Sequence, residues 1–538
     1  MASSSAPACV PESPHTAGIA ALSAAGAAQI IRATLILLFL VFVDAGAAHA
    51  TISYAISLDH PQQHLFHIEM NIPAEGREVT AALPAWNALY QIRDFAERIR
   101  DVTASCGGAE TPLEVHKTDK ETWKMSSQAR CTNFMIRYSI LWNDPGPFDS
   151  QLNPHHAFMN LAEILMYVPN RRAEATLVQF ANLPSGWQIA TALPVRVPGN
   201  SYTASSYDSL VDSPVEVGMF DQFSLESDGA PIHVIVDGKD SNKSRLESGL
   251  QTITAYELKM MGGAPFDTPD RGYTFIFHMG SSGEVGGGGM EHRNSSAIAC
   301  SSPEECVGIA AHEFFHAWNV KRIRPQSLEP VDYSREQYSR ALWFAEGVSN
   351  TYEDYALERT GLWSKEQFYR NLAGQIEILQ SRPARLWQSA EESSLDAWFE
   401  GFPDYADPSR SISYYNKGDI LGVLLDLAIR DATGNRKSLD DVMRRMNDEY
   451  AKEGKFYDDS DGVCRAAEEV SGKDFSEFFA RYVAGTNEIP YDRFLGLAGL
   501  ALTSEPRDGI QRYMIAETPQ PTARQLRIRE GLLHGTTD

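Results

Sequence analysis

The segment His312-Glu-Phe-Phe-His316 constrains this chain more than any other feature. It lies in an apolar run that begins near Val307 and suits a helix, so its two histidines share one helical face. Two imidazoles with this spacing fit adjacent corners of a tetrahedral zinc site. Glu313 stands beside them, where a general base that deprotonates water is needed. The alternative is a chance helix with a surface glutamate, but the phenylalanines of the motif and Trp318 favour a buried helix.

A third ligand is expected from another helix, because two histidines do not complete a zinc site. The best source is Trp343-Phe-Ala-Glu-Gly347, in which Glu346 is a lone acid among apolar residues. A buried carboxylate is costly without a cation, and zinc would supply one. We therefore predict that His312, His316 and Glu346 bind a metal ion. The alternative is that Glu346 is a surface residue at the start of a helix.

A glycine-rich segment, Gly286–Gly289, follows the predicted strand Tyr273–His278. It is interpreted either as a flexible loop or as a place where a substrate backbone pairs in β fashion, with Gly288, Gly289 and Met290 as contacts. Glu291 follows directly and is a candidate to hold the α-ammonium group of a peptide. The segment lacks the Lys-Ser/Thr pair of a phosphate-binding loop, which disfavours nucleotide binding.

A pair of tyrosines precedes the apolar helix predicted at 419–429. A tyrosine hydroxyl aimed at a scissile carbonyl stabilises the oxyanion that forms during hydrolysis. Tyr414 and Tyr415 are both candidates for this role, and the alternative is that both tyrosines only pack in the core.

Hydrophobic periodicity predicts an α+β multidomain chain. Alternating patterns at Thr51–Leu58, His64–Met70 and Thr132–Ile140 predict an N-terminal antiparallel β domain over residues 51–200. Strands at 231–236 and 273–278, a helix at 240–261 and helices from about 303 to 484 predict a second domain over residues 201–487. Residues 488–538 are expected to be a tail with one apolar stretch, 494–502.

The first fifty residues resemble an export signal. Arg32 precedes the apolar run 33–43, which Asp44 ends, and Ala48-His-Ala50 follows. The run is too short for a bilayer span, which needs about 20 residues. We interpret residues 1–50 as a signal peptide cleaved after Ala50; the alternative is an uncut N-terminal anchor. Either reading predicts a periplasmic or extracellular protein whose membrane contact is at most this segment.

The cysteines and the net charge limit the remaining choices. Export permits disulfides, and the candidate pairs are Cys300–Cys306 and Cys106–Cys131, with Cys464 left over. The alternative is that all are buried thiols, since spacing does not fix connectivity. A net charge of −24, from 47 basic and 71 acidic residues, disfavours a nucleic-acid partner.

Several of these motifs together resemble the glycyl aminopeptidase family, a gluzincin group of zinc metallopeptidases. His312–Pro325 resembles its active-site helix and Trp343–Gly347 its third-ligand helix. Further similar segments are Gly288–His292, Tyr414–Gly418, Leu83–Trp86, Tyr90–Phe95 and Lys117–Trp123.

The resemblance implies an N-terminal β domain followed by a thermolysin-like catalytic domain with one zinc ion per chain. It implies that His312, His316 and Glu346 are the ligands, Glu313 the base, Tyr415 the oxyanion donor and Glu291 the anchor of the substrate amino terminus. Two features depart from the family. About 50 residues follow Pro490, which is too few for the PDZ domain that members often carry, and Asn87-Ala88 replaces the usual Ser-Pro-Gly.

These observations predict a zinc aminopeptidase, and the resemblance alone implies a preference for small N-terminal residues such as Gly and Ala. One alternative is an endopeptidase with the same zinc chemistry. The other is a non-catalytic periplasmic binding protein stabilised by zinc. Glu313 speaks against the latter, because a structural zinc needs no base and usually has four protein ligands.

Overall fold

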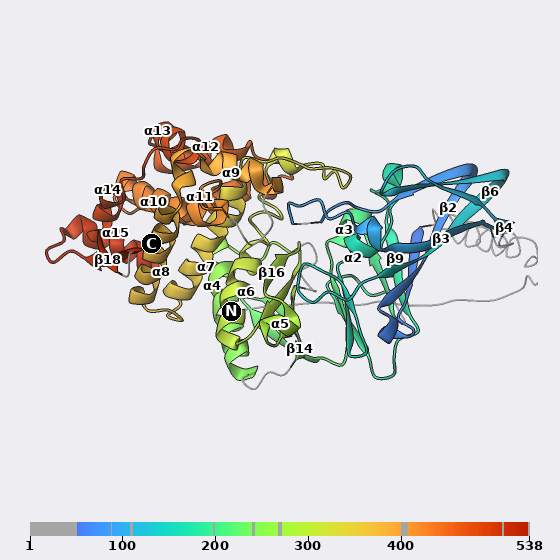
Figure 1. Cartoon of the computed structure of the whole chain (residues 1–538). Coiled ribbons are helices and arrows are strands. Elements are labelled where there is room, and N and C mark those ends of the chain that lie inside the picture. Colours follow the sequence, from blue (N-terminus) through green and yellow to red (C-terminus); the bar gives the residue numbers. More distant parts are fainter. Residues whose placement is uncertain are drawn as a thin grey trace, which may run out of the picture. The chain divides into compact units, whose positions relative to one another are not determined.

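The computed structural model describes residues 51–538, apart from residues 88, 108–110, 197–198, 239–242, 267–271, 400–406, 508–509 and 536–538 (Figure 1). The predicted signal peptide or anchor, and Cys9 with it, lies outside the described residues. None of the described helices is both long and apolar enough to span a bilayer. The predicted fold class is confirmed: a β domain is followed by a mixed sheet and a largely helical region.

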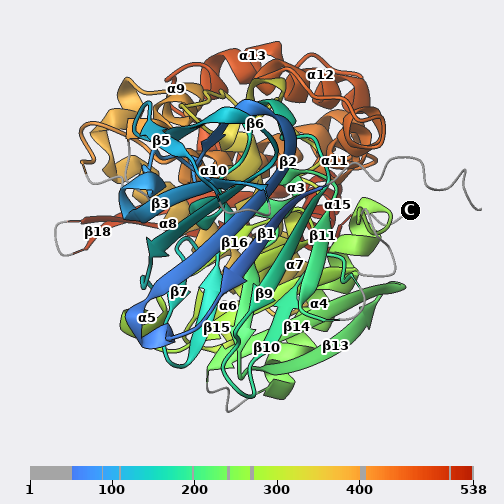
Figure 2. The same cartoon turned by 90° about the vertical axis from the view of Figure 1, so that its right-hand side faces the viewer.

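The N-terminal domain has a large sheet with the strand order β11-β9-β1-β2-β6-β3-β4, and β5 also pairs with β6 (Figure 2). Its strands are β1 (Ile52–Ser57), β2 (Leu65–Ala82), β3 (Ile99–Cys106), β4 (Thr111–Pro112), β5 (Glu114–Lys117), β6 (Thr122–Leu141), β9 (Thr176–Ala181) and β11 (Ser201–Ala204). Of the described pairs in this sheet, β1 and β9 are parallel and the others antiparallel. The alternation seen in the sequence is real, since inward-facing residues such as Ile56 and Ile68 are buried.

A second, smaller sheet connects this domain to the second domain. It has the order β10-β12-β8-β7 and consists of β7 (Gln151–Leu152), β8 (His156–Met159), β10 (Gln188–Thr191) and β12 (Val215–Gly218). A small apolar core joins Phe158 of this sheet to Ile235 and Ile276 of the sheet that follows. The two sheets are therefore packed against each other.

The sheet of the second domain has five strands in the order β13-β14-β15-β17-β16: β13 (Asp221–Ser227), β14 (Ala230–Gly238), β15 (Tyr273–Met279), β16 (Gly288–Glu291) and β17 (Ser295–Cys300). The sequence left two interpretations of Gly286–Gly289, a flexible loop or a place where a substrate backbone pairs. The loop is wrong for Gly288 and Gly289, which belong to a strand. Gly288–Glu291 is itself the edge strand, antiparallel to β17, and Ser282–Val285 before it forms the short helix α5. Gly286 has a φ of 75°, which lets the chain turn between the two.

The helix that carries the histidine motif, α6, spans Pro303–Phe315 and begins four residues before the expected start near Val307. Its N-terminus has good capping: the Ser302 side chain accepts a hydrogen bond from the backbone N–H of Glu305, and Pro303 occupies the first turn. The Cys300–Cys306 disulfide joins its first turn to β17, and the Cys106–Cys131 disulfide joins β3 to β6. Cys464 is a free thiol.

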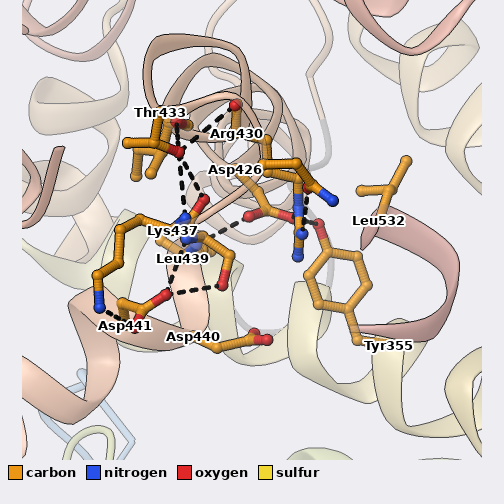
Figure 3. Close-up of polar contacts among 12 residues, drawn as sticks. Tyr355, Asp426, Arg430, Thr433, Lys437, Leu439, Asp440, Asp441 and Leu532 are labelled. Atoms are coloured by element: carbon orange, nitrogen blue, oxygen red, sulfur yellow. Dashed lines mark hydrogen bonds and ion pairs between the residues drawn. The ribbon is translucent and has the colours of Figure 1, made fainter. Parts of the chain in front are cut away.

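The helical region surrounds α10. Its main helices are α4 (Lys243–Met261), η6 (Trp343–Gly347), α7 (Val348–Arg359), α8 (Lys365–Ser381), α10 (Tyr414–Thr433), α11 (Leu439–Met446) and α12 (Asp459–Ser471). Figure 3 shows how one buried carboxylate links three of them. Asp426 of α10 accepts hydrogen bonds from Arg430 Nε at 2.9 Å, from the Tyr355 hydroxyl of α7 at 3.0 Å and from the backbone N–H of Leu439 of α11 at 2.8 Å.

The segment 488–538, expected to be a tail, is folded in its described residues. It forms α14 (Tyr491–Leu495), the hairpin β18 (Leu500–Arg507) and β19 (Ile510–Glu517), and α15 (Ala523–His534). The apolar stretch at 494–502 and Leu532 of α15 are part of the main core. Lys365 of α8 pairs with Glu517 at 2.8 Å, so the hairpin is also held by charge.

Candidate active site

Three predicted metal ligands converge in the structure from two helices. His312 lies near the end of α6, His316 follows as its C-cap, and Glu346 lies in η6. His316 Nε2 is 2.9 Å from His312 Nε2 and 3.2 Å from Glu346 Oε2, and His312 Nε2 is 3.6 Å from the same oxygen. All three side chains are buried. This arrangement places three ligand atoms around one point.

The donor atoms suit a zinc ion. His316 Nδ1 donates a hydrogen bond to the backbone carbonyl of Asn319 at 2.5 Å, since a carbonyl oxygen only accepts. In the neutral ring, this fixes the tautomer and leaves a lone pair on Nε2, which faces the other two groups. Burial opposes ionisation of Glu346, but the two histidines outweigh it and hold the pKa of Glu346 below its usual range. Two neutral imidazoles and a carboxylate form a typical catalytic zinc donor set.

Asn319 also connects the two helices that carry the ligands. Its side-chain amide donates to the carbonyl oxygens of Phe344 at 2.9 Å and Ala345 at 3.2 Å, just before Glu346. Residues 343–347 form a π-helical turn, a geometry often found at functional sites. Sequence analysis gave Asn319 no role, although it lies inside the helix motif. Asn319 and η6 are far apart in the sequence, so local sequence patterns do not reveal the hydrogen bonds between them.

Two glycines let a third helix approach the site. A Cβ added to Gly347 would lie 2.6 Å from the carbonyl carbon of Gly418 on α10, which no side chain tolerates. The contact brings the start of α10 next to η6. The Tyr415 ring centroid lies 6.3 Å from that of His312, whereas Tyr414 is buried in the core. Tyr415 is therefore the tyrosine beside the metal ligands.

Glu313 points toward the edge strand. A Cβ on Gly289 of β16 would lie 2.6 Å from Glu313 Cδ, so only glycine fits there. Glu313 is buried, and its Oε2 has no hydrogen-bond partner among the described residues. Burial raises the pKa of Glu313 well above its usual range. An unpartnered carboxylate with a high proton affinity is suited to accept a proton.

Glu353 is a further carboxylate that sequence analysis did not find. Its Oε2 lies 3.9 Å from Nδ1 of His312, and that nitrogen has no hydrogen-bond partner among the described residues. Glu353 lies on α7, two helical turns beyond Glu346. A metal-binding histidine usually directs its second nitrogen at such an acceptor. The only sequence signal for Glu353 was its spacing of two helical turns from Glu346.

Glu291 ends β16 and faces a cavity of about 540 Å³. Its Oε1 is 3.5 Å from Lys321 Nζ, which also pairs with Asp212 at 3.2 Å. Met290 and Tyr90 line the same cavity. Burial raises the pKa of Tyr90, and the charges of Glu346 and Glu291 add to the effect, so Tyr90 lies within the field of the site. Its role was not predicted, although its segment was part of the resemblance.

Two family models and several solved structures match this chain. The model of the M61 glycyl aminopeptidase matches residues 305–421, and that of the peptidase M61 N-terminal domain matches residues 53–219. No curated protein matches the chain. A solved structure of an aminopeptidase N family protein from Idiomarina loihiensis is 24% identical, covers 86% of this chain and 81% of its own, and has a TM-score of 0.80. It shows the same fold.

Two further solved structures are more distant. Yeast LTA4 hydrolase in complex with bestatin is 12% identical over 84% of this chain and 70% of its own, with a TM-score of 0.48. Legionella pneumophila aminopeptidase A in complex with aspartic acid is 14% identical over 86% of this chain and 51% of its own, with a TM-score of 0.47. Neither adds to the fold assignment. The family models match both the β domain and the helices of the site, and the chain belongs to the M61 glycyl aminopeptidase family of peptidases.

Proposed function

We propose that this chain is a zinc-dependent aminopeptidase that removes N-terminal residues from peptides. The observation that supports this most strongly is the convergence of His312, His316 and Glu346 beside the unpartnered carboxylate of Glu313. A zinc ion held by these three ligands would supply a Lewis acid that polarises the scissile carbonyl and makes water more acidic.

Glu313 is the general base in this proposal. It takes a proton from the attacking water and later delivers it to the leaving amine. Tyr415, beside His312, donates a hydrogen bond to the oxyanion. The high proton affinity of Glu313 suits both steps, because the same carboxylate has to accept a proton and then release it to a more basic amine.

Glu291 and β16 position the substrate. β16 is an edge strand of the five-stranded sheet, which is called the catalytic sheet from here on, so a peptide can pair with it as an added strand. Glu291 at the end of that strand then binds the α-ammonium group and limits cleavage to the first peptide bond. Gly288 and Gly289 keep the strand free of side chains next to Glu313. The family supports a preference for small residues such as Gly and Ala.

We also propose that the protein works outside the cytoplasm, in the periplasm or the extracellular medium, on peptide substrates. The two disulfides support this, because they form and persist in oxidising compartments. The N-terminal segment at 33–43 is the only proposed membrane contact.

Peptides that begin with Gly or Ala, each compared with its N-acetylated twin, test the proposal. We expect cleavage of the free peptide only, and loss of that cleavage in Glu291→Gln, because acetylation or loss of the carboxylate removes the ammonium–carboxylate contact. Equal cleavage of both twins would contradict the aminopeptidase and support an endopeptidase. Bound zinc without cleavage of either twin or of a peptide library would point to a non-catalytic binding protein.

A further inference from the structure

A second cluster of histidines and acids lies between the four-stranded sheet and the five-stranded sheet. His156 of β8 and Glu216 of β12 come from the four-stranded sheet. His278 of β15 and Asp237 of β14 come from the five-stranded catalytic sheet. His156, Glu216 and His278 are buried, with Glu216 at 0% exposure. These four residues are called the inter-sheet cluster below.

Each oxygen of Glu216 faces a different imidazole. Glu216 Oε1 is 3.0 Å from His156 Nδ1, and Glu216 Oε2 is 2.9 Å from His278 Nε2. Asp237 Oδ2 lies 3.3 Å from the same nitrogen of His156. One nitrogen or oxygen from each of His156, Glu216 and His278 lies within 4.8 Å of the others, as in the active site.

The ring of His156 is held from its far side. His156 Nε2 is 2.9 Å from Gln151 Oε1, so Nε2 is the donor and Nδ1 faces the carboxylates. A neutral ring with this tautomer would place the lone pair of Nδ1 against an oxygen of Glu216. That contact is repulsive unless a proton on Nδ1 or a metal ion lies between the two atoms. His316 in the active site has the same arrangement, with its outer nitrogen donating to Asn319.

The charges in this region also favour a cation. Glu216 is fully buried, and each of its two oxygens lies within 3.0 Å of an imidazole nitrogen. Asp237 brings a second carboxylate next to it. Two acids that converge with two imidazoles in a buried place carry negative charge that has to be neutralised. Either protons on the imidazoles or a divalent metal ion can neutralise it.

We propose that His156, Glu216, His278 and Asp237 form a second metal site, which binds a divalent ion of the zinc class and joins the N-terminal domain to the catalytic sheet. Four protein ligands leave no corner for a substrate, which is typical of a structural zinc site. Because the ligands come from four strands of two sheets, metal binding would couple the docking of the sheets to the folding of the chain. This inference does not depend on the proposed peptidase activity.

Metal content of the full-length protein tests the proposal. Purified protein is loaded with Zn²⁺, passed over a desalting column and analysed by elemental mass spectrometry. We expect two zinc ions per chain in the wild type, one in Glu346→Gln, one in Glu216→Gln and none in the double variant. One ion in the wild type and none in Glu346→Gln would overturn the proposal and show that protons neutralise the inter-sheet cluster.

Two further measurements keep the test decisive if Glu216→Gln does not fold. Glu257→Gln is the matched control, because Glu257 is equally buried and neither of its oxygens has a hydrogen-bond partner among the described residues. It should keep both ions. X-ray absorption at the zinc edge of folded Glu346→Gln should show two imidazoles in a four-coordinate nitrogen and oxygen shell. A spectrum of hydrated zinc without imidazole would contradict the site.

Discussion

The active site and the inter-sheet cluster each contain two histidines and a glutamate, but in two different constructions. In the active site, two ligands lie four residues apart at the end of one helix, and the third comes from an adjacent helical turn. In the inter-sheet cluster, each residue comes from a separate strand, and the strands belong to two sheets. A helix fixes its ligands locally, whereas the strand-built cluster exists only when two sheets are docked.

The carboxylates show the second difference. Glu313 stands next to the predicted ligand His312 and keeps an oxygen without a hydrogen-bond partner among the described residues. Both oxygens of Glu216 are bonded to imidazoles, and Asp237 adds a fourth donor. A base without a partner and only three protein ligands are typical of a catalytic zinc site. Four protein ligands are typical of a structural zinc site. The following changes test this distinction.

Glu313→Gln should have the largest effect. It removes the base and leaves the ligands in place, so kcat should fall by about 10²–10⁴-fold while the zinc content of the protein stays the same. Steady-state kinetics on a Gly-anilide together with elemental analysis checks both. Turnover at the wild-type rate would show that another group removes the proton.

Glu216→Gln should act on stability. Removing one partner of a buried charge cluster leaves the other uncompensated and typically costs about 3–5 kcal/mol. Thermal unfolding followed by circular dichroism should therefore begin at a lower temperature than in the wild type and in Glu257→Gln. An unchanged unfolding curve would mean that the cluster does not hold the sheets together.

Tyr415→Phe should lower kcat by about 10²–10³-fold with a small change in KM, because the hydroxyl acts on the oxyanion and not on the bound substrate. Tyr414→Phe is the matched control, since Tyr414 is buried in the core, and its kinetics should remain close to the wild type. A larger loss of kcat in Tyr414→Phe than in Tyr415→Phe would assign the oxyanion contact to Tyr414.

Glu353→Gln should have the smallest effect. Glu353 orients His312 from 3.9 Å and does not bind the metal in this account, so the affinity for zinc should fall by about 10–100-fold. Competition with a zinc-binding dye measures this change. Glu358→Gln on the same helix serves as the control, and an equal loss in both variants would remove the special role of Glu353.

The two constructions also explain what the sequence could reveal. The spacing of His312 and His316 is a local property of a helix, and Glu346 stands in a short apolar segment, so these residues could be found without a structure. Tyr415 was chosen over Tyr414 only through the family resemblance. Asn319 and Glu353 act through contacts between helices, which local patterns do not encode. The inter-sheet cluster draws on residues from His156 to His278 without a shared spacing and was therefore invisible.

The fold shows the same division. Alternation and helical periodicity predicted the β domain and most helices. The edge strand at Gly288–Glu291 was missed because its glycines have low strand propensity, and pairing with β17 overrides it. The segment 488–538 was expected to be a tail because its strands are exposed on most of their length. Its order depends on α8 and α10, which lie far away in sequence.

The central claim is that His312, His316 and Glu346 bind one catalytic metal ion, and crystals of the active enzyme measured across the zinc absorption edge test it most directly. The account predicts an anomalous peak about 2.0–2.2 Å from Nε2 of both histidines and from a Glu346 oxygen, with Glu313 adjacent. Crystals that cleave a Gly-peptide but show no peak at this position would contradict it.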